Sequence, residues 1–287
     1  MLELPEVETV RQGLLPIMKE RKILKLDQRR EDLRWPLPKN LPSRVKNFKI
    51  SNILRRSKYL LINLNSAETI IIHLGMSGRL LVLKDSDDTT TGIGNFNYKT
   101  HNIDKHDHII IYLDSGVRIV YNDPRRFGAI DLVSTVKIKS HKWLKKLGPE
   151  PLGNQFSSYY FYEKIRKRKS SIKAALMDQT LVAGLGNIYV LEALWLTKIS
   201  PLRKANNVSK SEVEALTNSI RRVLTLAIKA GGTSLQDFRQ AGGEIGYFAQ
   251  RLAVYGRTGQ PCQVCATPIK MILQTGRASF YCPRCQN

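Results

Sequence analysis

Four cysteines near the end of the chain have the type and spacing of a metal site. Cys262 and Cys265 form one C-x₂-C pair, Cys282 and Cys285 form a second, and sixteen residues separate them. Each pair can bind one side of a tetrahedral ion, so the spacing predicts one structural zinc ion. Two disulfides or buried free thiols are the alternative. The first residues do not resemble a secretory signal, which argues against the compartment that disulfides need.

A basic hairpin is predicted between the two cysteine pairs. Residues Ile269–Leu273 and Ala278–Tyr281 have the pattern of two short strands, with Arg277 at the tip between them. No Asp or Glu occurs from Ile245 to Asn287. A rigid, positively charged tip suits the groove of an anionic polymer, although a zinc ribbon alone predicts only nucleic-acid or protein binding.

Two further stretches carry residues suited to chemistry or to DNA insertion. Lys58 directly precedes the apolar strand Tyr59–Leu64, where partial burial would lower its pKa, although a lysine there usually just extends to solvent. Met76 lies between glycines, and Arg125 and Phe127 share one turn. An arginine beside an aromatic residue can fill a disrupted base stack. The alternative is a turn whose arginines pair with local acids.

The charge of the chain predicts a polyanionic partner. Lys and Arg total 46 against 24 Asp and Glu, which gives a net charge of +22. A solvated basic surface is the alternative. Apolar runs are too short to cross a bilayer. We therefore expect a cytoplasmic, nucleoid-associated protein of bacterial type.

The pattern of apolar residues predicts an α+β fold in two parts. A helix begins at Pro5, two residues after Glu3, and short β-branched runs from 45 to 133 indicate an antiparallel sandwich. Residues 84–105 are expected to form a mobile loop. Helical segments then follow, including Ser209–Lys229 and a helix that starts near Asn187 after two glycines and faces a phosphate. The expected division is 1–135, a linker at 136–152, and 153–287 with a zinc finger at about 251–287.

Five separated stretches, taken in order, resemble the formamidopyrimidine-DNA glycosylase family, with the endonuclease VIII-like enzymes as more distant relatives. The resemblance covers nearly the whole chain. Its stretches are Glu3–Thr9, Lys58–Leu61, Asp123–Gly128, Gly184–Tyr189 and Cys262–Cys285.

This resemblance implies a monomer with an N-terminal antiparallel β-sandwich and a helical domain with a helix–two-turn–helix and a zinc finger. It also implies that double-stranded DNA binds in a basic cleft and that an oxidised purine, such as 8-oxoguanine or a formamidopyrimidine, is flipped out. Flipping costs least at a damaged base, which adds selectivity. The implied activity is base-excision repair by a bifunctional glycosylase and abasic-site lyase.

The resemblance assigns roles residue by residue. Three positions match catalytic residues of the family. Glu3 matches the proton donor to the sugar, Lys58 the residue that assists β-elimination, and Arg277 the residue linked to δ-elimination. The residues implied to fill the space left by the flipped base are Met76, Arg125 and Phe127. Further positions that match DNA contacts are His106, Arg168 and Asn187. The stretch Gly231–Tyr247 resembles a flexible loop that covers the lesion.

Position 2 departs from the family pattern. The family has a proline whose terminal amine attacks the sugar C1′, whereas this chain has Leu2. A terminal amine has a pKa near ~7.7–8.0, against ~10.4 for lysine, so it is far more available at neutral pH. We expect Met1 to be retained before a large residue, which would displace the amine by up to roughly 3.8 Å.

Three explanations of Leu2 remain open. The sequence is a variant of a parent with proline, the protein binds lesions but catalyses poorly, or Lys58 serves as the nucleophile. Two functions from other classes also remain: a non-catalytic lesion-binding or architectural DNA protein, and a zinc-ribbon protein associated with RNA or the ribosome. The last ignores the stretches around Glu3 and Phe127.

Overall fold

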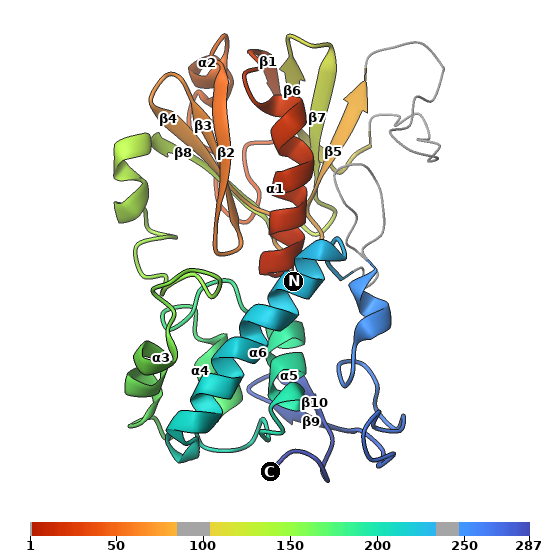
Figure 1. Ribbon diagram of the computed structural model, residues 1–287. Coiled ribbons are helices and arrows are strands. Elements are labelled where there is room, and N and C mark those ends of the chain that lie inside the picture. The colour runs from red at the N-terminus through yellow and green to blue at the C-terminus, as the bar shows by residue number, and fades with distance from the viewer. Residues whose placement is uncertain (1, 85–103, 234–246) are drawn as a thin grey trace. The chain divides into compact units, whose positions relative to one another are not determined.

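The computed structural model describes residues 2–84, 104–233 and 247–287 (Figure 1). The expectations for the loop at 84–105 and for most of Gly231–Tyr247 therefore lie outside the described residues. The described chain divides into two compact units, which we call the sheet unit (2, 6–84, 104–145 and 231–233) and the helical unit (3–5, 146–230 and 247–287). None of the helices described is long and apolar enough to cross a membrane.

The sheet unit is an antiparallel β-sandwich, as the sequence predicts. One sheet has the order β1-β6-β7-β5 and the other has the order β2-β3-β4-β8, as Figure 1 shows. The elements of this unit are α1 (Leu4–Met18), β1 (Ile23–Gln28), α2 (Leu41–Val45), β2 (Ile50–Arg56), β3 (Tyr59–Leu64), β4 (Glu68–His73), β5 (Arg79–Lys84), β6 (Asp107–Leu113), β7 (Val117–Asn122), β8 (Ala129–Ser134) and η1 (Thr135–Ser140).

One apolar core fills this sandwich. Ile53 of β2, Ile72 of β4, Ile111 of β6 and Ile119 of β7 are all buried in it, and Leu14 of α1 packs there too. Burial of this area is the main favourable contribution to folding of the unit. Its residues alternate along the strands, which is why the pattern of β-branched runs locates most strands correctly.

The helical unit has an apolar core of its own. Its elements are α3 (Ser158–Ile165), α4 (Ile172–Met177), α5 (Asn187–Leu196), η2 (Ala205–Asn207), α6 (Lys210–Lys229), η3 (Phe248–Arg251), β9 (Lys270–Gln274) and β10 (Arg277–Tyr281). Ser209 caps α6 and forms a reciprocal capping box with Glu212. The apolar face of α6, which includes Val213 and Ile220, packs on α5 and α3.

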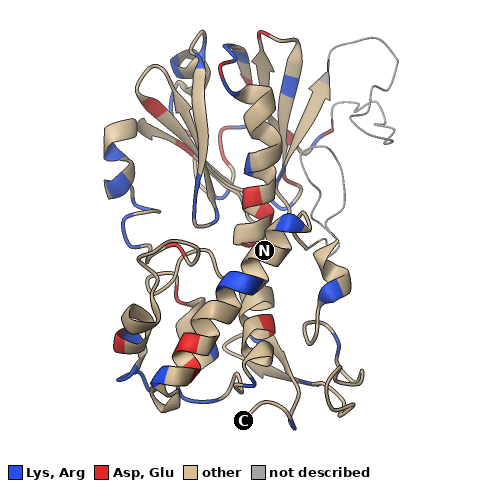
Figure 2. Ribbon diagram, viewed as in Figure 1, with Lys and Arg blue, Asp and Glu red and all other residues tan. Residues whose placement is uncertain are grey.

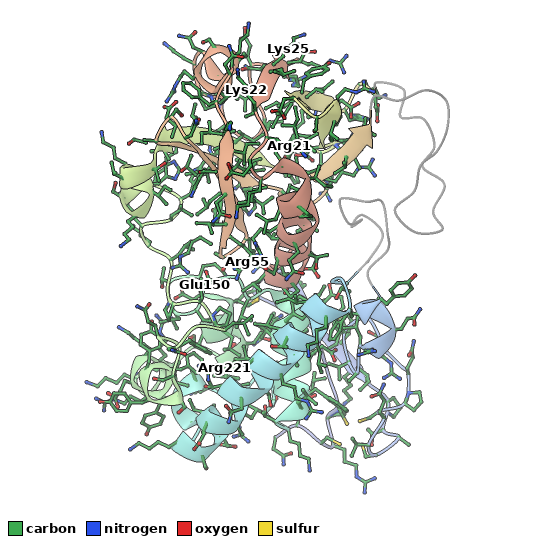
Figure 3. The ribbon with its side chains drawn as sticks, turned by 45° about the horizontal axis from the view of Figure 1, so that its top comes forward. Arg21, Lys22, Lys25, Arg55, Glu150 and Arg221 are labelled. Atoms are coloured by element: carbon green, nitrogen blue, oxygen red, sulfur yellow. The ribbon has the colours of Figure 1, made fainter. Side chains whose placement is uncertain are left out.

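Arg221 ties α6 to the segment that enters the helical unit. Its guanidinium donates hydrogen bonds to the carbonyl oxygens of Pro151, Gly153 and Phe156, the last at 2.7 Å. Figure 3 labels Arg221 on α6. Because this one side chain satisfies three loop carbonyls, residues 151–156 are held against the helix.

Candidate functional site

Glu3 lies at the amino terminus of α5. Its side chain is 3% exposed, and its Oε1 accepts a hydrogen bond of 3.0 Å from the backbone N–H of Ile188. The N–H of Leu4 donates to the carbonyl oxygen of Gly184, at 3.1 Å, which fixes the chain next to the helix. The positive end of the helix dipole stabilises the Glu3 carboxylate. These contacts explain why residues 3–5 belong to the helical unit although α1 continues into the sheet unit.

Gly186 is required for this arrangement because a side chain there would collide with Glu3. A Cβ atom on Gly186 would lie 2.2 Å from the Glu3 Cδ. The sequence predicts that the glycines before α5 let its N–H groups face a phosphate. In the structure, the N–H of Ile188 instead binds a carboxylate of the same chain.

Leu2 is anchored in the sheet unit. Its side chain is 8% exposed and belongs to the sandwich core. Its backbone N–H donates to the carbonyl oxygen of Gly75 at 3.3 Å. Position 2 is therefore adjacent to the loop that carries Met76.

Lys58 is buried at the tight turn between β2 and β3. It is 7% exposed and follows Ser57, whose φ of 54° is left-handed. Burial, together with the positive charges of Lys58 and Arg34, lowers the pKa of His73 to about 4. The predicted partial burial of Lys58 is present. His73 was not identified from the sequence, although a histidine at the end of a strand, two residues before Gly75, is a usable signal.

The three predicted gap-filling residues line one pocket of the sheet unit. Met76 comes from the loop between β4 and β5, and Arg125 and Phe127 come from the loop between β7 and β8. The pocket has a volume of about 530 Å³, and its other lining residues include Arg34 and His73. The Arg125 guanidinium lies 4.9 Å from the centre of the Phe127 ring, which is 44% exposed. Cationic and aromatic groups thus stand together at the surface.

Arg277 begins the second strand of the zinc-finger hairpin, and Asn187 contacts the next residue of that strand. Arg277 is exposed and begins β10, while the Asn187 Nδ2 donates to the carbonyl oxygen of Ala278 at 2.9 Å. Burial and the Arg277 charge lower the pKa of Lys173 to about 8, and the Lys173 Nζ donates to the Ser279 Oγ at 2.6 Å. Lys173 was not identified from the sequence, because its position in an apolar helix gives no signal.

Arg168 belongs to the helical unit and His106 belongs to the sheet unit. The Arg168 guanidinium forms an ion pair with Asp178 at 3.0 Å in the helical unit. In the sheet unit, the backbone oxygen of His106 accepts a hydrogen bond from the N–H of Asp123. His106 is therefore next to the loop that carries Arg125.

The four cysteines converge as a zinc site requires. Their sulfur atoms all lie within 4.8 Å of one another, and none forms a disulfide. Hydrogen bonds from Thr267 lower the pKa of Cys265 to about 6, whereas burial raises the pKa of Cys282 and the hydrogen bond with Cys265 raises the pKa of Cys285 to about 12. Zinc binds cysteine in the thiolate form. The predicted hairpin is formed by β9 and β10, and Figure 2 marks its basic residues in blue.

Three family models match consecutive parts of the chain. The N-terminal domain of formamidopyrimidine-DNA glycosylase matches residues 1–130, its helix–two-turn–helix domain matches 147–239, and a zinc finger found in this family and in isoleucyl-tRNA synthetase matches 259–287. The chain belongs to the formamidopyrimidine-DNA glycosylase family. Its finger therefore holds one structural zinc ion, ligated by the four cysteines.

Whole-length relatives agree with this assignment. The chain is 50% identical to the formamidopyrimidine-DNA glycosylase of Dinoroseobacter shibae and 49% identical to that of Roseobacter denitrificans, with 100% of each chain covered. A Lactococcus lactis glycosylase mutant solved with DNA containing Fapy-dG is 36% identical, with a TM-score of 0.87 and 99% of both chains covered. The Thermus thermophilus enzyme is 33% identical, with a TM-score of 0.85 over 99% of this chain and 98% of that one. The α+β fold class and the family resemblance are confirmed.

Proposed function

We propose that this glycosylase binds double-stranded DNA, flips out an oxidised purine and removes it, and then cuts the strand as an abasic-site lyase. The observation that carries the proposal is the buried Glu3 carboxylate, held at the start of α5 directly after position 2. A Lactococcus lactis relative has been solved with DNA containing Fapy-dG, and another related structure contains carbocyclic 8-oxo-G DNA. Both support an oxidised purine as the substrate.

The chemistry needs an amine and a proton donor at the sugar. An unprotonated amine attacks C1′, the bond from C1′ to the base breaks, and the base leaves with a proton while an imine forms on the sugar. Glu3 is the residue to which we assign the proton transfer to the sugar ring oxygen. Loss of a C2′ proton then breaks the C3′–O bond, which is the step assigned to Lys58. Loss of a further sugar proton breaks the C5′–O bond, the step assigned to Arg277.

Leu2 supports a second candidate, a protein that binds lesions without catalysis. Leu2 occupies the position of the family proline, and its N–H is already donated to the carbonyl oxygen of Gly75. A buried lysine can supply the missing amine if its pKa falls by about 2.5 units relative to ordinary lysine, which costs ~3.4 kcal/mol. Lys58 is the candidate for this role.

Borohydride trapping distinguishes these possibilities. The full-length protein is mixed with a labelled duplex containing 8-oxoguanine opposite cytosine, reduced with borohydride, and analysed by peptide mapping. An adduct on the terminal residue or on Lys58 supports catalysis and identifies the nucleophile. Absence of an adduct with retained preference for the oxidised duplex leaves only the binding role. Equal affinity for oxidised and undamaged duplexes would refute the proposal as a whole.

Two variants accompany the trapping experiment: Glu3→Gln is the test variant and Glu163→Gln is its control. Glu3→Gln keeps an oxygen that accepts from Ile188 but removes the carboxylate, so we expect retained lesion binding and a loss of adduct of at least about tenfold. Glu163→Gln changes an exposed carboxylate of the helical unit, paired only on the surface with Arg166 at 2.8 Å. It should trap like the unchanged protein.

A further inference from the structure

Two loops that carry the gap-filling residues meet at one buried carboxylate. Asp123 is fully buried, and its Oδ1 accepts a hydrogen bond of 2.6 Å from the Ser77 hydroxyl. Its Oδ2 accepts from the Gly128 N–H at 2.8 Å and from the Tyr121 hydroxyl at 3.2 Å. Ser77 follows Met76 and Gly128 follows Phe127, so a single side chain contacts both loops. Hydrogen bonds to a buried charge are among the stronger ones in proteins.

Ser77 extends this connection to the third gap-filling residue. Its Oγ, while donating to Asp123, accepts a hydrogen bond of 3.2 Å from the backbone N–H of Arg125. The backbone oxygen of Asp123 also accepts a hydrogen bond of 3.2 Å from the N–H of Arg126, which is the backbone hydrogen bond of the turn. The amide of Arg125 is thus fixed by a side chain of the other loop.

The backbones of the two loops also touch at glycines. A Cβ atom on Gly75 would lie 2.5 Å from the backbone carbon of Phe127 and 2.6 Å from the backbone nitrogen of Gly128. Gly75 has a φ of +66°, a conformation that favours glycine. Any side chain at Gly75 would therefore separate the loops. Close packing and a buried polar network therefore hold the same junction.

We propose that Asp123 and Ser77 are positioning residues that lock the two loops into one preformed wedge before DNA arrives. The wedge is the set Met76, Arg125 and Phe127. Its effect on DNA rests on the proposed function. A preformed wedge lowers the conformational entropy that must be lost when the three side chains enter the base stack. It also fixes the backbone position of Arg125, the residue that the family resemblance places opposite the flipped base.

Hydrogen exchange tests the preformed state without DNA. In the free, full-length protein, the amides of Arg125 and Gly128 should be protected, because a side chain of the junction accepts from each. Ser77→Ala removes only the hydroxyl, so it should speed exchange at Arg125 by about tenfold or more, as expected for one lost hydrogen bond. Ser43→Ala is the matched control, since the Ser43 hydroxyl bonds only the carbonyl oxygen of Asn40 in the sheet unit. Exchange at the unprotected rate in the unchanged protein overturns the proposal.

DNA binding tests the consequence of the lock. We measure the dissociation constants of the unchanged protein, Ser77→Ala and Ser43→Ala for an 8-oxoguanine duplex with cytosine or adenine opposite, and for the oxidised strand alone. The preference for the duplex with cytosine over the duplex with adenine opposite the lesion should fall about tenfold in Ser77→Ala. Its affinity for the oxidised single strand should not change. A general structural defect would instead weaken binding of the duplexes and of the single strand equally. That result would contradict the proposal. If the unchanged protein does not prefer oxidised DNA, the proposed function fails, while the exchange experiment still tests the preformed wedge.

Discussion

At the scale of single residues, burial determines the charge states around Lys58. His73 is held neutral by burial and by the positive charges of Lys58 and Arg34. Its Nδ1 accepts the backbone N–H of Gly75 at 3.1 Å, so the proton of the neutral ring lies on Nε2. At neutral pH the Nε2–H group of His73 is therefore available as a hydrogen-bond donor. Because the ring is neutral, it does not place a second positive charge beside Lys58.

We predict that His73 titrates with a pKa of about 4. The folded pKa lies below the unfolded value of ~6.5, so the unfolded state binds more protons between these values. This residue therefore causes the stability to fall as the pH drops from about 6.5 to 4, at up to ~1.4 kcal/mol per pH unit. Imidazole nitrogen shifts measured by NMR check the pKa. An ordinary titration near 6.5 would contradict it.

Gly186→Ala should displace the Glu3 carboxylate from α5, because the added methyl would lie 2.2 Å from the Glu3 Cδ. We expect a loss of ~1–3 kcal/mol in the free energy of unfolding, from the broken charge-assisted hydrogen bond and the steric conflict. Chemical denaturation measures the change. Gly153→Ala is the control, since its nearest atom would be 3.4 Å away and its φ is not left-handed. Equal stability of the two variants would exclude the steric requirement.

At the scale of elements, α1 supports the turn that carries Lys58. The Arg55 Nε donates to the Glu8 Oε2 at 2.9 Å, and the Arg55 Nη1 donates to the carbonyl oxygen of Ser57 at 2.9 Å. Figure 3 labels Arg55, which lies at the end of β2 beside α1. Glu8 also accepts from Arg11 at 2.7 Å. Glu8 of α1 therefore supports the left-handed conformation of Ser57 through Arg55.

Glu8→Ala should destabilise the protein by about 2 kcal/mol, because both arginines lose a half-buried carboxylate acceptor. Thermal unfolding measures the loss. The control Glu163→Ala, at an exposed pair with Arg166, should change stability by less than about 0.5 kcal/mol. A similar small change for Glu8→Ala would show that the pair contributes nothing to the turn.

Removing zinc should unfold the finger and leave the sheet unit folded. Cys262, Cys282 and Ile269 form a small cluster with Leu191 and Val254, and Trp195 packs against it. This cluster is too small to persist without the metal. In a variant with Trp35 and Trp143 replaced by Phe, Trp195 is the remaining tryptophan, and a strong chelator should change its fluorescence. Elemental analysis should give one zinc per chain; none would contradict the assignment.

The sequence predicts most elements but not every residue of the site. Short β-branched runs between residues 45 and 133 predict the sandwich that contains β3, β4, β6, β7 and β8, and the cysteine spacing predicts the finger. The strand β1 is missed, because Leu24 is exposed and charged residues interrupt the alternation. Asp123 and Ser77 could not be paired from the sequence, since they lie forty-six positions apart and no motif joins them. Such contacts depend on the pairing of strands, which local pattern does not specify.

At the scale of the whole molecule, the net charge of +22 predicts strongly salt-dependent DNA binding. If about 6–10 phosphates are contacted, affinity for undamaged duplex should fall by roughly 10³–10⁵ between ~50 and ~200 mM salt. Arg277→Gln should reduce the slope of log K against log salt by about one. The control Lys25→Gln lies at the end of the sheet unit opposite Arg55, as Figure 3 shows, and should not change the slope. Weak salt dependence would contradict a phosphate-contacting surface.

The first residues of the chain make the two units inseparable by a single cut. Residues 3–5 belong to the helical unit, whereas the chain before and after them belongs to the sheet unit. A gene divided between Lys145 and Lys146 would therefore encode a first fragment that carries Glu3 but lacks Ile188, its hydrogen-bond donor. Neither product would contain the complete carboxylate site. The separately expressed halves would regain it only by reassembling, so their recombination would report directly on this short stretch.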